Sequence, residues 1–427
     1  MNPEYTNSSS ASSVISSGAL KMQEEMGSEP SKESKLKAFF SILRKFVGVK
    51  DIANVRFSLP AQLLEPISNL DYWNYLDRPD AFVSIGQQND ALLRMLEVLR
   101  FWFTKDLKFI KGRPCKPYNS TLGEMFRCHW DVDAPMADIE GSTDTTSQHC
   151  RVAFITEQTS HHPPISAFYA ECRERGIVAY GMDQLSASFT GTSIKVMPGE
   201  SNHGIFIKLR GRGDEEYRLT HPNAFLGGFL RGSIHVSIQG TTYVTCKQTD
   251  IVAVMEYFED GWFSKTKNRV KGVIYSSRDL GGELFNVNNV PPGRILATFG
   301  GCWREDLVYQ IAGAASKTLI SIPPLEVYPK IRVPLEKQMA HESGILWQPV
   351  TEAIHYGQLS QATKRKTEIE ETQRELATRR KEREETWTPR YFKTPVLEGR
   401  PKLTNSGLDI INSLFENNPS SSNPTTS

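Results

Sequence analysis

Residues 234–258, IHVSIQGTTYVTCKQTDIVAVMEYF, decide the fold class of this chain. Isoleucine and valine alternate with polar residues over 234–238, which is the period of a β-strand with one buried face. Gln239–Gly240 then predicts a hairpin turn into a partner strand that carries threonine and tyrosine. After a polar break, Ile251–Phe258 is the next predicted strand. Short strands joined by turns indicate an antiparallel meander.

The same pattern continues on both sides of this stretch. Ile205, Ile207 and Leu209 alternate upstream, and Val270–Tyr275 and Ile295–Phe299 are further predicted strands downstream. The sequence therefore predicts a mainly β (α+β) fold, because a large antiparallel sheet of this kind tends to close on itself into a barrel. A barrel with that many strands is too wide for side chains alone to fill, so it can enclose a ligand.

Helical periodicity flanks the predicted strands. The stripe Leu92, Leu93, Leu96, Leu99 and Trp102 predicts a helix over Asp90–Phe103. A long charged helix is expected from Gln361 to about Glu385, and a short one at Asp409–Phe415. Near the N-terminus, Lys35–Val47 has the apolar spacing of an amphipathic helix with a basic face.

Composition excludes several classes of protein. The formal net charge of the 427 residues is +1, so nucleic-acid binding through bulk charge is not expected. No run of about 18 uncharged apolar residues is present, so no membrane-spanning helix is predicted. The polar, Ser-rich N-terminus does not resemble a signal peptide, and the six cysteines lack CxxC spacing. We expect a cytoplasmic protein with reduced thiols.

The most specific segment is EQTSHHPPISAF at Glu157–Phe168. Its two prolines fix φ and interrupt regular structure, so the histidines are expected on a rigid, non-regular loop. Imidazole donates hydrogen bonds to phosphate oxygens, and donates best when it is charged. The alternative is a surface turn whose histidines are satisfied locally.

EQTSHHPP resembles the signature EQxSHHPP of the oxysterol-binding protein family. Two further blocks support the resemblance, KPYNSTLGE at Lys116–Glu124 and KTEIEETQR at Lys366–Arg374, although Ser120 stands where the family has proline. The resemblance covers roughly residues 35–392. It implies a nearly closed antiparallel barrel around a lipid tunnel, with an N-terminal lid and flanking helices.

By matching motif, the resemblance also implies a set of residues that bind a phosphoinositide headgroup: Lys116, Asn119, His161, His162, Lys366, Glu370 and Arg374. The last three are spaced four apart, so they share one helix face. Lysine and arginine there can neutralise a phosphate, and Glu370 can orient them. Without the resemblance, a solvated helix with ordinary ion pairs would explain this spacing.

The resemblance places a lid at the amphipathic segment and tunnel-lining residues soon after it. The residues expected in the lid and tunnel are Leu36, Phe39, Phe40, Leu43, Phe46 and Trp73. Three phenylalanines beside a basic face suit a helix that touches a membrane surface. The alternative is a helix packed permanently on the core.

These observations predict the following domain organisation. Residues 1–34 are Ser- and Glu-rich and expected to be disordered, and 401–427 form a flexible tail. Between them lies one lipid-binding domain, 35–400, and its parts are expected at 35–50 (lid helix), 51–110 (N-terminal helical part), 111–310 (barrel) and 311–400 (C-terminal helical part).

The function implied is transfer of single lipids between membranes, most simply sterol exchanged for phosphatidylinositol 4-phosphate. Exchange of phosphatidylserine for that phosphoinositide, or lipid sensing without bulk transfer, are alternatives. No HExxH or GxSxG motif occurs, so we expect no enzyme, catalytic residue, metal or cofactor. We expect a monomer that contacts organelle membranes peripherally and transiently.

Overall fold

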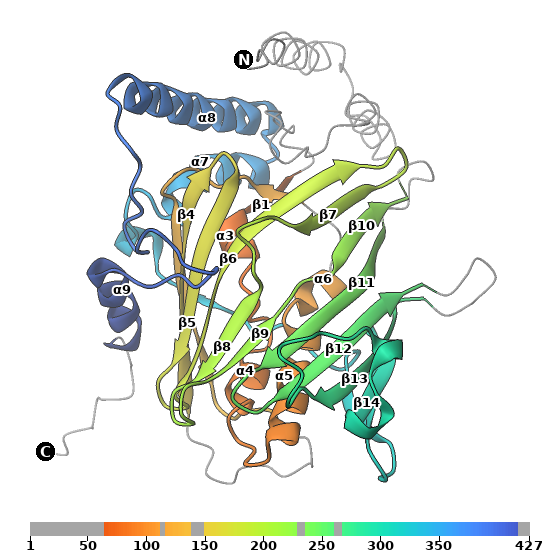
Figure 1. The fold of residues 1–427 in the computed structure, drawn as a ribbon. Coiled ribbons are helices and arrows are strands. Elements are labelled where there is room, and N and C mark those ends of the chain that lie inside the picture. Colours follow the sequence, from red (N-terminus) through yellow and green to blue (C-terminus); the bar gives the residue numbers. More distant parts are fainter. Residues whose placement is uncertain (1–63, 112–115, 138–148, 229–234, 260–266, 417–427) are drawn as a thin grey trace, which may run out of the picture.

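The computed structural model describes residues 64–111, 116–137, 149–228, 235–259 and 267–416. The expected lid residues Leu36, Phe39, Phe40, Leu43 and Phe46 lie outside these ranges. Within them, one sheet of 15 strands dominates the fold, and its paired strands run antiparallel. Figure 1 shows this sheet curving around a group of helices. The predicted mainly β class, with a large and nearly closed antiparallel barrel, is confirmed.

Most strands of the sheet lie next to their neighbours in sequence. The path is β16-β15-β14-β13-β12-β11-β10-β7-β6-β5-β4-β3-β17, while β8 joins β6 to β9 and β9 joins β11. The bounds are β3 Met125–Val132, β4 Cys150–His161, β5 Pro164–Cys172, β6 Ile177–Phe189, β7 Ile194–Pro198, β8 Ile205–Leu209, β9 Glu215–Leu219, β10 Asn223–Gly227, β11 His235–Cys246, β12 Ile251–Phe258, β13 Arg269–Ser276, β14 Ile295–Cys302, β15 Asp306–Ile311, β16 Lys317–Ser321 and β17 Ile331–Arg332.

The predicted turn at Gln239–Gly240 is wrong. Strand β11 runs straight through these residues, and Gly240 has φ of 104°, which favours glycine. Up to Gln239 the strand pairs with β10. From Gly240 onward it pairs with β12, and Val244–Cys246 also pair with β9. The glycine thus marks the point where one long strand changes partners. A glycine beside a polar residue in an alternating pattern is typical both of a hairpin turn and of a glycine inside a continuous strand, so the pattern alone does not distinguish the two.

Four short elements of helix fill the concave side of the sheet (Figure 1). They are α3 Asn69–Tyr72, α4 Pro79–Ser84, α5 Ala91–Thr104 and α6 Leu107–Lys111. The predicted helix at Asp90–Phe103 is confirmed as α5, with Asp90 accepting hydrogen bonds from the backbone N–H groups of Leu92 and Leu93. No helix in the described ranges combines the length and apolar character needed to cross a bilayer.

Helix α5 is surrounded by the barrel wall. Every side chain from Arg94 to Thr104 is buried, and one core cluster joins its apolar residues to strands across the sheet. Burying each large apolar side chain contributes about 1.5–3 kcal/mol. The buried charges on the helix are paired, with Arg94 contacting Glu215 at 2.7 Å and Arg100 contacting Glu97 at 2.9 Å.

The C-terminal helices cover one end of the barrel. They are α7 Ser343–His355 and α8 Leu359–Glu382, and α8 confirms the predicted long charged helix. Beside them lies a parallel pair of strands, β1 Leu64–Ser68 and β2 Lys116–Tyr118. The Tyr118 ring stacks on Trp347 of α7, with ring centroids 4.6 Å apart. This packing fixes the start of the KPYN block against both helices.

The flexible tail predicted from residue 401 begins too early. Residues 405–416 form α9, Asn405–Glu416, which packs on β4 and buries Ile411 and Leu414. The Arg151 side chain also donates to the Leu414 carbonyl at 2.9 Å. The short helix expected at Asp409–Phe415 lies within α9, and its apolar stripe is sufficient to dock the helix on the barrel. The sheet likewise continues past the predicted barrel limit at residue 310, through β16 and β17.

Candidate functional site

The twin histidines lie at the tip of the β4–β5 hairpin. His161 is the last residue of β4 and pairs with Pro164, the first residue of β5. His162 and Pro163 form the turn between them, and the peptide bond joining these two residues is cis. The imidazole rings are 4.6 Å apart at an interplanar angle of 62°. The expected non-regular loop is therefore a tight hairpin turn, which presents His162 at the surface and His161 half-buried.

The hairpin tip is anchored by Glu157, the first residue of the signature. Its buried carboxylate accepts hydrogen bonds from the backbone N–H groups of Arg390 and Tyr391, at 2.8 and 2.9 Å. Burial raises the pKa of Glu157, and these two N–H groups oppose that rise. The carboxylate thus ties the barrel to the C-terminal segment. An acidic residue within a strand that is otherwise mostly apolar was the signal for this role in the sequence.

A second buried carboxylate, Glu124, anchors the KPYN block to neighbouring segments. It accepts from the Thr121 N–H at 2.9 Å, from the Ser343 hydroxyl at 2.7 Å and from the Trp347 indole at 3.1 Å. The Ser68 hydroxyl also donates to it. Glu124 therefore joins β1, the KPYN loop and α7 at one point. Local sequence patterns do not predict this role, because the partners on α7 are more than 200 residues away along the chain.

Lysine and asparagine of the KPYN block contact each other directly. The Lys116 ammonium donates to the Asn119 amide oxygen at 2.6 Å. On α8, Lys366 is buried and forms an ion pair with Glu370, and Arg374 approaches the same carboxylate at 3.9 Å. The spacing predicted from the sequence therefore places all three side chains on one face of the helix.

Electrostatics show that Lys116 and the α8 cluster are neighbours. Burial among protein groups and the Lys366 ammonium lower the pKa of Lys116 to about 8, while Glu370 opposes the decrease. The Glu370 carboxylate therefore pairs with the Lys366 ammonium and lies in the field of the Lys116 ammonium, with the Arg374 guanidinium close by. This arrangement carries excess positive charge that a phosphate monoester can neutralise.

The histidine hairpin and the KPYN block lie at the same end of the barrel. The Gly123 N–H donates to the Gln158 carbonyl, and the Gln158 N–H donates to the Glu124 carbonyl, both at 2.9 Å. These bonds extend the β3–β4 ladder beyond Met125 and Glu157. In Figure 1 the tips of β4 and β5 end beside α7 and below α8. The predicted headgroup residues thus gather at this end. Lys116 contacts Asn119 directly, and Glu370 contacts Lys366 and Arg374 within α8.

Inside the barrel is a set of polar side chains that local sequence patterns do not predict. Tyr75 donates its hydroxyl to Asp183 of β6 at 2.7 Å, and burial raises the pKa of Asp183 to about 7. The indole of Trp102 donates to the Tyr257 hydroxyl at 2.7 Å. Tyr75 has φ of 60°, an uncommon value for an aromatic residue, so its tertiary contacts hold it there.

His221 lies between these two pairs. Its ring is 5.5 Å from that of Tyr75 and 5.7 Å from that of Trp102. Burial and the nearby Lys105 ammonium lower the pKa of His221 to about 3, so the imidazole is neutral at physiological pH. Its Nε2 atom is buried and has no hydrogen-bond partner in the described part of the chain. A buried polar atom of this kind is typical of a place where a ligand completes the hydrogen bonding.

Trp73, the expected tunnel residue, caps the C-terminal end of α3 and is half-buried. Its ring meets that of Tyr72 edge-to-face, with centroids 4.9 Å apart. Among the residues that the structure describes, no three His, Cys, Asp or Glu side chains are grouped closely enough to hold a metal ion.

Binding of an anionic headgroup is expected to weaken about three- to tenfold as the pH rises from about 7 to 9. The pKa of Lys116 is about 8, below its ordinary value of 10.5, so the ammonium loses its charge across this range. Extraction of phosphoinositide from liposomes at several pH values measures the effect. Lys116→Arg is the matched control, because guanidinium stays charged and should remove most of the dependence. An equal decline in both proteins would contradict the assignment.

Comparison with known proteins adds to this geometry. A family model described as oxysterol-binding protein matches residues 38–353. Oxysterol-binding protein-like protein 1 of Schizosaccharomyces pombe is 38% identical, over 89% of this chain and 91% of that protein. Human oxysterol-binding protein-related protein 5 is 31% identical over 87% of this chain, which spans 40% of that longer protein.

Solved structures show the same fold. The Osh1 ORD domain in complex with ergosterol superposes with a TM-score of 0.67 at 22% identity, covering 88% of each chain. The Osh3 ORD in complex with PI(4)P from Saccharomyces cerevisiae gives a TM-score of 0.62 at 21% identity, covering 88% of this chain and 91% of that one. At these identities the likeness concerns the arrangement of strands and helices.

Proposed function

This chain belongs to the oxysterol-binding protein family, and from that membership we propose that it carries single membrane lipids and exchanges sterol for phosphatidylinositol 4-phosphate. In this proposal the protein works as a monomer in the cytoplasm and touches organelle membranes only transiently. Binding and release carry out the whole function, without a chemical step. Structural neighbours with the same fold are complexes with ergosterol, cholesterol and PI(4)P, which supports lipids as the cargo.

The observation that carries the proposal is the cationic cluster at the end of the barrel. Lys366 and Arg374 flank the Glu370 carboxylate, and Lys116 lies within its electrostatic reach. These four residues carry an excess of two positive charges when Lys116 is protonated. A 4-phosphate carries about two negative charges at neutral pH. The Asn119 amide and the two imidazoles add donors for phosphate and inositol oxygens. The acyl chains would then extend into the barrel, where each buried methylene contributes about 0.8 kcal/mol.

The polar set inside the barrel favours sterol as the second cargo. A sterol has one hydroxyl at the end of a rigid apolar body, so a carrier that takes it in hydroxyl-first needs interior hydrogen-bonding groups. Asp183, His221 and Tyr257 supply such groups next to the apolar wall of α5. Phosphatidylserine would place only hydrocarbon at this depth, and the buried His221 Nε2 atom would then gain no hydrogen-bond partner from the lipid.

Transfer between two liposome populations tests the proposal. Donor liposomes contain sterol and acceptor liposomes contain phosphatidylinositol 4-phosphate, and the movement of each lipid is followed separately. We expect both rates to rise with protein concentration, and sterol transfer to accelerate when the phosphoinositide is present. Binding of both lipids without faster transfer would indicate a sensor. Transfer of phosphatidylserine in place of sterol would indicate the other exchange.

A further inference from the structure

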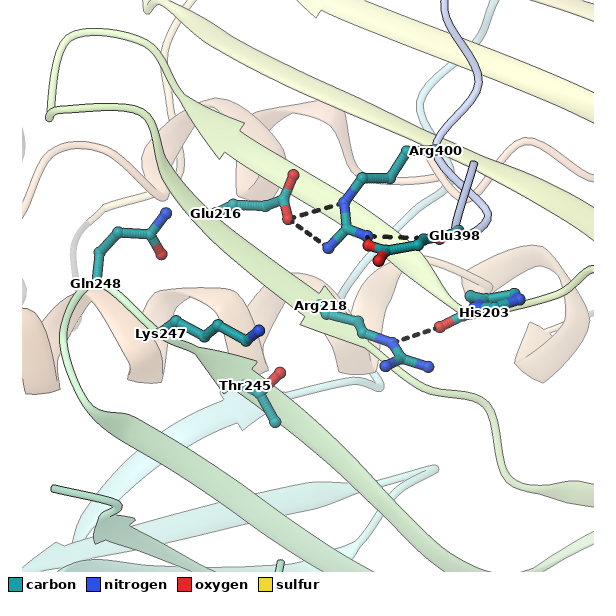
Figure 2. A pocket seen from close by; sticks show the side chains of 8 residues that line it. All are labelled: His203, Glu216, Arg218, Thr245, Lys247, Gln248, Glu398 and Arg400. Atoms are coloured by element: carbon teal, nitrogen blue, oxygen red, sulfur yellow. Dashed lines mark hydrogen bonds and ion pairs between the residues drawn. The ribbon is translucent and has the colours of Figure 1, made fainter. Parts of the chain in front are cut away.

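A second polar pocket lies on the outer face of the barrel, away from the headgroup cluster. It has a volume of about 320 Å³ and lies over strands β9 and β11, with the segment 398–400 forming its rim (Figure 2). The lining side chains come from three parts of the chain that are far apart in sequence. The function proposed above does not use this pocket.

Strand register explains why charged side chains meet here. Arg218 of β9 is directly opposite Thr245 of β11, and the next pair along, Tyr217 and Cys246, points into the core. Because side chains alternate between the two faces, Arg218, Thr245 and Lys247 all point outward. Figure 2 shows Lys247 and Thr245 on the same side of β11, facing Arg218 across the pocket.

The charges of this pocket are only partly compensated. Arg400 contacts Glu216 at 2.9 Å and Glu398 at 2.8 Å, so it engages both carboxylates of the pocket. Arg218 donates its Nε to the His203 carbonyl at 2.7 Å. Within the described ranges, the two terminal nitrogens of Arg218 and the ammonium of Lys247 form no ion pair or hydrogen bond with the protein.

The electrostatic environment of Arg218 also indicates uncompensated positive charge in the pocket. Burial lowers the pKa of Arg218, and the neighbouring Arg400 lowers it further, while Glu398 has the opposite effect. A guanidinium in this position gains from an added anion, because the anion offsets the repulsion by the second guanidinium. Two terminal N–H groups of an arginine match two oxygens of a phosphate, and a lysine adds a point charge.

We propose that this outer pocket binds a phosphate monoester group, held by the Arg218 fork, the Lys247 ammonium and the Thr245 hydroxyl. Glu398 borders the site, so it disfavours polyanions and can accept hydrogen bonds from hydroxyl groups of the ligand. The phosphate can belong to a small soluble molecule or to a lipid headgroup. The pocket would give the protein a second, independent contact with phosphate outside the lipid-carrying barrel.

Methyl NMR of threonine-labelled full-length protein tests this site, because the Thr245 methyl reports on the pocket. Inorganic phosphate is the probe, with sodium chloride at equal ionic strength as the reference. We expect a saturable shift of the Thr245 signal with phosphate and none with chloride. Arg218→Gln should weaken the apparent affinity at least about tenfold, and Lys247→Gln should weaken it less. Lys317→Gln, at an exposed lysine on β16, is the matched control.

Two further arms separate this site from the headgroup cluster and identify the source of the phosphate. His161→Ala with His162→Ala should leave the Thr245 shift intact, and Arg218→Gln should leave lipid transfer intact. Vesicles of phosphatidylcholine with phosphatidic acid should broaden the Thr245 signal, relative to phosphatidylcholine alone, if the ligand is a lipid headgroup. A shift that does not saturate with phosphate, or that persists unchanged in Arg218→Gln, would overturn the proposal.

Discussion

Replacing His161 and His162 together by alanine is expected to reduce extraction of phosphatidylinositol 4-phosphate from liposomes about 10- to 100-fold. The two rings adjoin each other at the tip of the β4–β5 hairpin, at the end of the barrel that carries Lys116 and Lys366. A hydrogen bond to a charged group contributes about 1.5–3 kcal/mol, which corresponds to this range even if only one imidazole binds the phosphate directly. Sterol extraction should change little, because a sterol has no group that reaches the phosphate site.

The matched control is His355→Ala, which removes an exposed imidazole from the last turn of α7. This variant should extract both lipids as the unmodified protein does. Circular dichroism and thermal unfolding show whether the hairpin variant keeps its fold. Loss of both lipids in a folded double variant would place the histidines in a shared part of the cavity and would argue against the headgroup assignment.

Local patterns in the sequence predicted the elements whose structure depends on neighbours along the chain. Helices α5 and α8 appear where the apolar stripe and the charge spacing indicate, and the Lys366–Glu370–Arg374 face follows from helical geometry alone. The turn expected at Gly240 was wrong. Whether the chain continues as one strand or reverses in a hairpin depends on which strands lie beside it. Those neighbours are set by the whole sheet.

Roles that depend on distant partners could not be predicted from local patterns. Tyr75 meets Asp183 across 108 residues, so neither indicates a polar barrel interior when considered alone. The outer pocket similarly requires the pairing of β9 with β11 and the return of Arg400 from the C-terminal segment. Glu124 and Glu157 belong to motifs associated with binding, but the structure gives both of them buried anchoring contacts.

Glu124→Ala is therefore expected to act first on stability, lowering the free energy of unfolding by roughly 3 kcal/mol. The substitution leaves the Ser343 hydroxyl, the Trp347 indole and the Thr121 N–H buried without their acceptor. Urea-induced unfolding followed by tryptophan fluorescence measures the loss. Glu382→Ala, which removes an exposed carboxylate at the end of α8, should change stability by less than about 0.5 kcal/mol.

Substitutions of Glu124 should lower both stability and headgroup binding. Its carboxylate holds the loop after Lys116, and this loop carries Asn119. Burial raises the pKa of Glu124, and its hydrogen bonds oppose that rise. Glu124→Gln keeps one acceptor oxygen and should lose less stability than the alanine variant. If alanine cost no more stability than glutamine, water would be replacing the carboxylate at this junction. The anchoring role of Glu124 between the KPYN loop and α7 would then be wrong.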